Sequence, residues 1–237
     1  MLDRVFQSLY RRFLAPRVPE WFFRELIKKT DNFGSVTWLG APVWQNVLDL
    51  WTMQETIAEI RPALFIETGT NRGGSALFVA NLFDLMNHGR VVTVDVEVLH
   101  HIVHPRITFL VGSSTSAETL EAVRGIASTV GGPIMVSLDS DHSESHVRAE
   151  LTAYAPLVTP GSYCLVQDGV IDVLPGFAGA RPGPLPAIKP FLQNHPEFEL
   201  DSDRSQRFLI SHHPNGWLRR RVDSLDRGGI LAHAPRN

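Results

Sequence analysis

The sequence predicts an α/β protein built on a doubly wound sheet with helices on both of its faces. Short apolar segments alternate with segments of helical periodicity between residues 64 and 166, as in repeated strand–helix–strand units. Several apolar segments lack polar residues at alternate positions, which is typical of parallel strands buried on both faces. With 237 residues, 43% of them hydrophobic, the chain is long enough for one such domain with additions.

The elements follow in regular order. We expect strands at Leu64–Glu67, Val91–Asp95, Ile107–Val111, Ile134–Leu138 and Tyr163–Val166. We expect helices at residues 44–60, Ser75–Met86, Ala117–Ser128 and Ser143–Leu157. The T-x-x-E spacing of Thr115 and Glu118 predicts a capping box at the start of the third helix.

The C-terminal part is less regular. Residues 172–190 are rich in proline and glycine and predict a long ordered loop, a kind of segment that is often functional. A short helix around Ala187–Gln193 follows. Closing strands are expected at Phe198–Leu200 and Phe208–Ser211.

The chain divides into an N-terminal helical arm and loop (1–43), a main domain (44–221) and a polar tail (222–237). The arm predicts two amphipathic helices broken at Pro16 and Pro19. Their apolar faces would be formed by Val5, Leu9 and Phe13 and by Phe22, Leu26 and Ile27. We interpret the arm as a packing or subunit-contact element and expect a homodimer or higher homo-oligomer. Attachment to a membrane surface is less favoured, because the arm has few basic residues.

Composition excludes several classes of protein. The net charge of −3 argues against nucleic-acid binding driven by phosphate contacts. A single cysteine, Cys164, rules out an internal disulfide framework, and its apolar surroundings predict a buried strand position. No apolar stretch is long enough for stable membrane insertion, and arginines interrupt any signal-peptide core. We therefore expect a cytoplasmic protein.

The segment FIETGTNRGGS, residues 65–75, joins a strand to a helix through a glycine turn. Such a turn lets the backbone approach a nucleotide-like ligand closely. Its spacing, G-x-x-x-G-G, differs from the dinucleotide motif G-x-G-x-x-G. Glu67 would repel a pyrophosphate and suits a cationic group. Asp95, at the end of the next strand, could accept the ribose hydroxyls, or it could be only a helix cap or a solvated strand end.

Polar residues also end the later strands. The segment SLDSDHS, residues 137–143, contains Asp139, Asp141 and His142, and Asp168 follows the next strand. Asp139 and Asp168 would converge from adjacent strands, and two carboxylates suit Mg²⁺ or another hard cation. His142 lies at a helix start, which favours a neutral ring that can act as a base. Asp141 could instead cap the helix, and a lone histidine is more often structural.

The chain resembles the cephalosporin hydroxylase-like O-methyltransferases, which include rhamnosyl O-methyltransferases, a methylmannose polysaccharide O-methyltransferase and macrolide sugar methyltransferases. The matching segments are VWQNVLDLWTMQE, FIETGTNRGGSALFVAN, SLDSDHSESHVRAEL, VLPGFAGARPGPLPAI and NGWLRR. They span roughly residues 38 to 220. The combination of D-S-D-H-S with L-P-G-F carries the resemblance, whereas the glycine turn alone is not specific.

The resemblance implies a Rossmann-like class I methyltransferase fold, S-adenosylmethionine (SAM) as donor, a divalent cation such as Mg²⁺, and a saccharide hydroxyl as acceptor. The implied donor-site residues are Glu67, Gly69, Thr70, Asn71, Gly73, Ser75, Asp95, Ser113, Ser114 and Asp139. The implied metal ligands are Asp139, Gln167 and Asp168, and His142 has the position of the general base. Gln167 departs from the Glu-Asp pair of many relatives, which predicts weaker metal binding or a site completed by substrate or water.

The acceptor pocket or a lid over it is expected from the loop 172–189 and from Trp38 and Trp44, which could equally be packing residues. Two other classes of function stay open on the residues alone. One is a nicotinamide-dependent oxidoreductase, which shares the crossover and Asp95. The other is a non-catalytic glycan-binding module on a methyltransferase fold, which only Gln167 favours.

Overall fold

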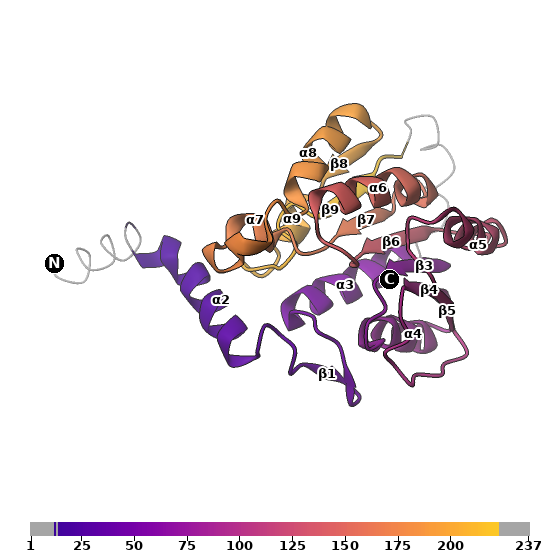
Figure 1. The fold of residues 1–237 in the computed structure, drawn as a ribbon, viewed down its shortest axis with the longest axis horizontal. Coiled ribbons are helices and arrows are strands. Elements are labelled where there is room, and N and C mark those ends of the chain that lie inside the picture. The colour runs from indigo at the N-terminus through magenta and orange to yellow at the C-terminus, as the bar shows by residue number, and fades with distance from the viewer. Residues whose placement is uncertain (1–11, 13, 223–237) are drawn as a thin grey trace, which may run out of the picture.

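The computed structural model describes residues 12 and 14–222 and confirms the α/β class (Figure 1). Within these residues the main sheet has seven strands in the order β5-β4-β3-β6-β7-β9-β8. Their bounds are Ile107–Val111 (β5), Arg90–Asp95 (β4), Leu64–Thr68 (β3), Ile134–Leu138 (β6), Tyr163–Val166 (β7), Trp217–Arg220 (β9) and Phe198–Leu200 (β8). The first five are parallel, and β9 lies antiparallel between β7 and β8.

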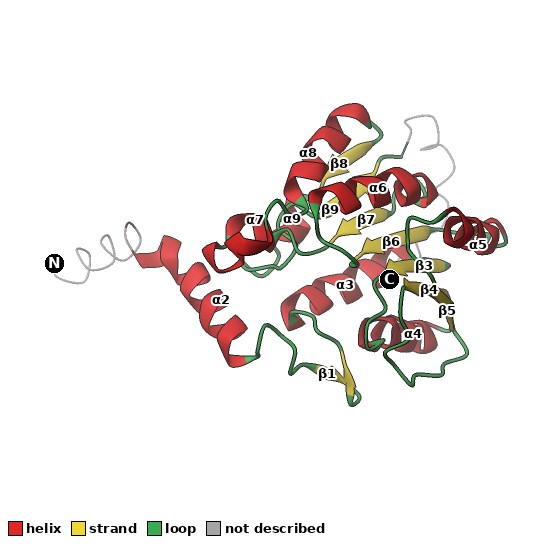
Figure 2. Ribbon diagram, in the orientation of Figure 1, coloured by secondary structure: helices red, strands yellow, loops and turns green. Residues whose placement is uncertain are grey.

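Helices cover both faces of the sheet (Figure 2). On one face, α3 (Val47–Ile60) and α4 (Gly74–Met86) pack through apolar side chains such as Met53 and Phe83. The other face is covered by α5 (Ala117–Ser128), α6 (Glu144–Tyr154) and α8 (Leu185–Asn194). The central strands β3, β6 and β7 divide their side chains between these two cores, which is why their sequences are mainly apolar. Cys164 is fully buried in the second of them, as predicted.

The capping box predicted for α5 was wrong by one residue. Ser116 is the N-cap, and its hydroxyl accepts a hydrogen bond from the backbone N–H of Thr119. Thr115 contacts the Ser113 hydroxyl instead. Thr115 and Ser116 both offer a hydroxyl near the helix start, and N-cap propensity does not distinguish a serine from a neighbouring threonine.

The N-terminal region differs partly from the prediction. A 3₁₀ turn, η2 (Ala15–Arg17), leads into α2 (Val18–Lys29), which contains Pro19 in its first turn, where proline is tolerated, and is not broken by it. Phe22 is 55% exposed, and the buried residue is its neighbour Phe23, which packs with Phe33 and Ile210. The helix expected around Val5, Leu9 and Phe13 lies outside the described residues. Strands β1 (Thr37–Trp38) and β2 (Ala41–Pro42) form a small hairpin before α3.

The segment predicted as a long loop is mostly helical. It contains α7 (Val170–Val173), η4 (Pro175–Ala180) and the first turn of α8. Asp172 organises it, because its carboxylate accepts hydrogen bonds from the N–H groups of Gly183 and Leu185. A further 3₁₀ turn, η3 (Ala155–Leu157), follows α6.

The last predicted strand was wrong. Residues Phe208–Ser211 form no strand, and the closing strand is β9, which follows an irregular segment after the short helix α9 (Ser202–Ser205). β9 inserts between β7 and β8 through long-range pairing, which local sequence does not specify. The described residues include no helix that is long and apolar enough to cross a membrane.

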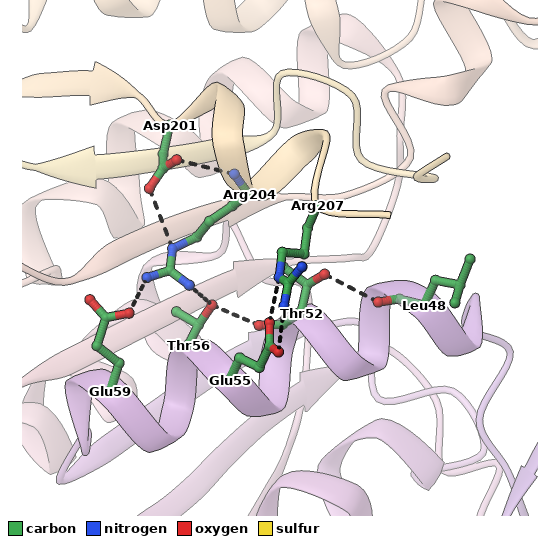
Figure 3. A network of polar contacts seen from close by, with 8 residues as sticks. All are labelled: Leu48, Thr52, Glu55, Thr56, Glu59, Asp201, Arg204 and Arg207. Atoms are coloured by element: carbon green, nitrogen blue, oxygen red, sulfur yellow. Dashed lines mark hydrogen bonds and ion pairs between the residues drawn. The ribbon is translucent and has the colours of Figure 1, made fainter. Parts of the chain in front are cut away.

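An arginine latch joins α3 to the segment around α9 (Figure 3). Arg204 donates to the Thr56 hydroxyl and to Glu59, both at 2.6 Å, and lies over the ring of Tyr163. Arg207 makes a two-pronged contact with the carboxylate of Glu55, at 2.9 and 3.0 Å. These contacts join the second half of α3 to α9 and to the residues that follow it.

Candidate active site

The glycine turn between β3 and α4 has left-handed backbone at Gly69, Asn71 and Gly73, and two of these positions require glycine. Gly69 has φ +87°, and a Cβ placed there would lie 1.9 Å from the carbonyl oxygen of Asp139. Gly73 has φ +76° and is the N-cap of α4. Only glycine allows this conformation and this approach without strain. The turn therefore brings its backbone against the end of β6, where Asp139 begins the next loop.

Asp95 supports the same turn from the end of β4. Its Oδ2 accepts a hydrogen bond of 2.7 Å from the backbone N–H of Asn71, and Oδ1 lies 3.3 Å from the N–H of Glu97. The side chain is thus at the predicted place beside the turn.

A cavity of about 350 Å³ opens in front of the turn. Eight of the predicted site residues line it, namely Gly69, Thr70, Asn71, Gly73, Ser75, Asp139, His142 and Asp168. The other predicted residues lie outside the lining: Glu67, Asp95, Ser113, Ser114 and Gln167. The structure thus joins the glycine turn and the strand-end acids in one cavity.

Glu67 lies beneath the turn, and only 1% of its surface is exposed. Its Oε2 accepts a hydrogen bond of 2.7 Å from the Thr93 hydroxyl, which also contacts the Thr70 hydroxyl at 2.6 Å. Burial raises the pKa of Glu67 from 4.5 to about 7, although hydrogen bonds from Ser75 and Thr93 oppose this shift. A carboxyl group in this state can ionise when positive charge arrives nearby.

Asp139, His142 and Asp168 come together at the other side of the cavity. Each offers a ligand atom within 4.8 Å of the others, a spacing that could hold a metal ion. His142 Nε2 lies 3.1 Å from Asp168 Oδ2. Burial raises the pKa of Asp139 well above its ordinary value, and the neighbouring charge of Asp168 adds to the shift. Asp141 points elsewhere and accepts a hydrogen bond from the N–H of Ser143, so it supports the start of α6.

Gln45 is a site residue that no sequence pattern had indicated. It precedes α3, is 6% exposed, and its Nε2 lies 2.7 Å from both Asp139 Oδ2 and Gln167 Oε1. Gln167 is itself buried and donates from Nε2 to the Ser137 hydroxyl at 2.8 Å. Both polar ends of Gln167 are therefore engaged with neighbouring side chains. The only available signal was the position of Gln45 in the segment VWQN, next to a helix start.

Two adjacent histidines were also missed. His213 is 1% exposed, and its Nδ1 accepts a hydrogen bond of 3.1 Å from the backbone N–H of Asp168. His212 lines the cavity against the rings of Phe23, Phe33 and Phe177. Burial lowers the pKa of His212, which favours a neutral ring. No spacing in the sequence links residues 212 and 213 to the strand ends, because tertiary packing alone brings them there.

Ser114, one of the two serines after β5 that were predicted for the donor site, takes part in a separate network. The Ser114 hydroxyl lies 3.1 Å from His146 Nε2, and the Ser140 hydroxyl lies at the same distance from that nitrogen. Ser140 also donates to the buried carboxylate of Glu150 at 2.7 Å. Ser113 contacts only Thr115 among the side chains. This network ties the loop after β5 to the loop after β6.

The remaining wall of the cavity is mainly apolar. It includes Trp44, Ile171, Phe177 and Ala180, so part of the predicted loop 172–189 does reach the site. Trp44 is 55% exposed at this wall. Trp38 does not line the cavity, because it packs edge-on against Phe78 and donates to Asn81.

Comparison with known proteins places this geometry in a family. The family model described as Rhamnosyl O-methyltransferase/CmcI matches residues 31–221. The chain is 34% identical over 213 residues to a rhamnosyl O-methyltransferase of Mycobacterium bovis (strain BCG / Pasteur 1173P2), covering 86% of this chain and 84% of that protein. It is 33% identical over 218 residues to a rhamnosyl O-methyltransferase of Mycobacterium leprae (strain TN), covering 88% and 91%.

The fold is similar to that of solved structures. The structure of cmcI-D160 with Mg and SAM superposes with a TM-score of 0.62 at 18% identity, covering 81% of this chain and 78% of that chain. The family match favours the methyltransferase interpretation over the nicotinamide-dependent oxidoreductase that the residues alone had left open. The chain belongs to the rhamnosyl O-methyltransferase/CmcI family of O-methyltransferases.

Proposed function

We propose that this protein transfers a methyl group from SAM to a hydroxyl group of a saccharide. The observation that carries the proposal is the single cavity in which the glycine turn faces Asp139, His142 and Asp168. The turn offers close backbone approach to a nucleoside-containing donor. The acids and the histidine offer groups that can activate a hydroxyl. The related proteins named rhamnosyl O-methyltransferases support a sugar acceptor.

The donor would occupy the side of the cavity formed by Gly69, Thr70, Asn71, Gly73 and Ser75. SAM supplies an electrophilic methyl group on a positively charged sulfonium. Asp139 lines the cavity and Glu67 lies directly beneath the turn, and the raised pKa values of both carboxyl groups mean that a nearby positive charge would favour their ionisation. Two such groups favour a cationic donor over a pyrophosphate.

The residues also fit a divalent cation held by Asp139 and Asp168. Burial and the neighbouring charge of Asp168 raise the pKa of Asp139, and the ligand atoms of the two aspartates lie within 4.8 Å of each other, so a cation between them would favour the ionised form of both. Gln167 is engaged with Gln45 and Ser137, so we assign the main ligand role to the two aspartates. When bound, such a cation would lower the pKa of the acceptor hydroxyl and hold its oxygen in place.

His142 is the proposed general base. Its ring lines the cavity and its Nε2 lies 3.1 Å from Asp168 Oδ2, so the imidazolium formed when the ring takes the proton of the acceptor hydroxyl would face this carboxylate. Asp168 would stabilise the resulting imidazolium, as carboxylates beside catalytic histidines do. General-base catalysis of this kind typically contributes about 10² to 10⁴ in rate. The apolar wall with Trp44 and Phe177 would exclude water from the methyl transfer and contact the sugar.

The experiment measures methyl transfer from labelled SAM to rhamnose-bearing glycosides, the first acceptors to test given the names of the relatives. His142→Ala is expected to abolish transfer while SAM binding by calorimetry is retained. His101→Ala, at an exposed histidine outside the cavity, serves as the matched control. Equal loss of binding and transfer would remove His142 from the base role. Full activity after thorough EDTA treatment would refute the cation, and no transfer to any saccharide would refute the acceptor class.

We also infer a cytoplasmic homo-oligomer that does not bind nucleic acid, with the arm (1–43), the domain (44–221) and the tail (222–237) as its units. The net charge of −3 supports the absence of nucleic-acid binding. Exposed apolar residues on α2, Val18, Trp21 and Phe22, support a subunit contact there. Light scattering of the purified protein would test the oligomeric state, and a strictly monomeric protein would contradict it.

A further inference from the structure

The two cavity aspartates are held by side chains from outside the strand-end motifs. Gln45 reaches Asp139 from the residue before the Asn46 cap of α3. His213 reaches Asp168 from the segment after α9. Neither residue belongs to the predicted donor, ligand or base set. Both are at least nine-tenths buried, and both make hydrogen bonds to a residue of the aspartate pair or its backbone.

The Gln45 contact fixes the direction of the Asp139 carboxylate. One amide nitrogen has two hydrogens, and here both have acceptors, Asp139 Oδ2 and Gln167 Oε1, each 2.7 Å away. The orientation of Gln167 is set in turn, because its Nε2 donates to the Ser137 hydroxyl and its oxygen must therefore face Gln45. Through this series of hydrogen bonds Gln45 binds Oδ2 of Asp139 and does not contact Oδ1.

The His213 contact fixes the backbone of Asp168. Asp168 has φ +55°, a left-handed conformation that few residues other than glycine, asparagine and aspartate adopt. Its N–H donates to Nδ1 of His213, so the ring nitrogen acts as an acceptor at that point. The other ring nitrogen, Nε2, is buried without a hydrogen-bond partner and lies 3.9 Å from Asp49 Oδ2. The contact that holds the site residue is thus the one through Nδ1.

The parts of the chain that supply the two contacts are also joined to each other. In the arginine latch, Arg204 of α9 and Arg207 after it contact Glu59 and Glu55 of α3 (Figure 3). Near the start of α3, Asp49 Oδ2 accepts the backbone N–H of His212 at 2.8 Å. The residues before α3 and the two histidines are therefore fixed to each other as well as to the aspartates.

We propose that Gln45 and His213 are positioning residues that hold Asp139 and Asp168 in the geometry that binds a divalent cation. This inference rests on the proposed function, since it assigns roles around the same aspartate pair. Groups that orient ligands from behind typically contribute 10- to 100-fold to metal affinity, so a loss of about that size is expected when either contact is removed. Binding of SAM through the glycine turn should change little, because neither side chain lines the cavity.

The test uses substitutions that remove one contact at a time. Gln45→Met keeps the shape and removes the donor, and Gln193→Met, at an exposed glutamine of α8, is its control. At position 213 the amide of asparagine reaches the place of Nδ1, whereas that of glutamine reaches the place of Nε2. His213→Asn should therefore retain the contact with Asp168, and His213→Gln should lose it. Gln45→Asn, which withdraws the amide, replaces Gln45→Met if that variant does not fold.

Mn²⁺ binding to the full-length protein is measured by electron paramagnetic resonance, with SAM binding and kcat and KM measured in parallel. The inference predicts Mn²⁺ affinity lowered about 10- to 100-fold in Gln45→Met and His213→Gln, with His213→Asn and Gln193→Met near the wild type. Unchanged affinity in the first two variants would overturn it, as would retention in His213→Gln with loss in His213→Asn. If the wild type binds no Mn²⁺, the cation in the proposed function is wrong. In that case kcat tests whether Gln45 and His213 position the aspartates for catalysis, and equal kcat in all variants overturns the positioning role.

Discussion

The buried carboxyl group of Glu67 makes the stability of this protein depend on pH in a direction opposite to that of most acids. Burial raises its pKa from 4.5 to about 7, which corresponds to about 3 kcal/mol of differential stability between the two protonation states. Glu67→Gln removes the ionisation and keeps the shape. The amide can accept a hydrogen bond from Thr93 and donate one to Ser75, the two residues that contact the carboxyl group.

The direction in which stability changes with pH follows from the pKa of Glu67 in the unfolded chain and its pKa in the folded protein. Below pH 4.5 the carboxyl group is protonated in both the folded and the unfolded chain, so Glu67 imposes no penalty. Between pH 4.5 and about 7 only the folded protein keeps the proton, so its stability falls as pH rises, and above about 7 the whole penalty applies. Glu67→Gln should therefore exceed the wild type by up to about 3 kcal/mol in alkaline buffer and match it in acid.

Urea unfolding of the ligand-free protein, repeated from about pH 5 to about pH 8, measures the difference in free energy of unfolding. Glu55→Gln is a control of opposite sign. The hydrogen bond from Arg207 lowers the pKa of Glu55, so that variant should lose stability at neutral pH and approach the wild type in acid. If the difference between the wild type and Glu67→Gln does not change with pH, the raised pKa of Glu67 is wrong.

Other predictions concern the turn and the cavity walls. Gly69→Ala should lower the free energy of unfolding by about 2–5 kcal/mol, because Ala is strained in left-handed backbone and its Cβ would overlap the next loop. It should melt well below Gly125→Ala, whose Cβ meets nothing within 4 Å, and equal melting temperatures would contradict the close approach. Gln167→Glu places a third carboxylate beside the two aspartates, so it should strengthen Mg²⁺ binding, measured by calorimetry, and lower the melting temperature of the metal-free protein. Weaker Mg²⁺ binding would count against the carboxylate site. Trp44→Ala should raise the acceptor KM about tenfold at unchanged SAM affinity, and Trp51→Ala, on the exposed surface of α3, should not; equal effects would remove Trp44 from the acceptor site.

The strands that carry the site could be predicted because local sequence determines them. β6 and β7 are buried at every position and consist almost entirely of apolar residues, so their predicted bounds agree with the structure. Asp139 and Asp168 come just after these two neighbouring strands. Asp139 and Asp168 could be paired from this placement alone, before any side-chain geometry was known.

The glycine turn was predictable for a similar reason, since its constraint lies in a few consecutive residues. What the sequence could not give is which predicted donor residues face the cavity. Ser75 and Glu67 both flank the turn, yet the first lines the cavity and the second is covered. The difference depends on how β3 packs against β4 through Thr93, which no local pattern encodes.

Gln45 and His213 show where prediction from local pattern ends. Each is an ordinary polar residue in its own segment, and each acquires its partner only through the tertiary fold. Gln45 and Asp139 are 94 residues apart in the chain, and His213 and Asp168 are 45 apart. A charge pair buried at a strand end needs hydrogen-bond partners wherever the fold can supply them. A sequence that places two acids at adjacent strand ends therefore implies supporting donors and acceptors without naming them. Here the residue before α3 and the segment after α9 supply them, and the hydrogen bond from the His212 N–H to Asp49 joins these two parts of the chain near the aspartates.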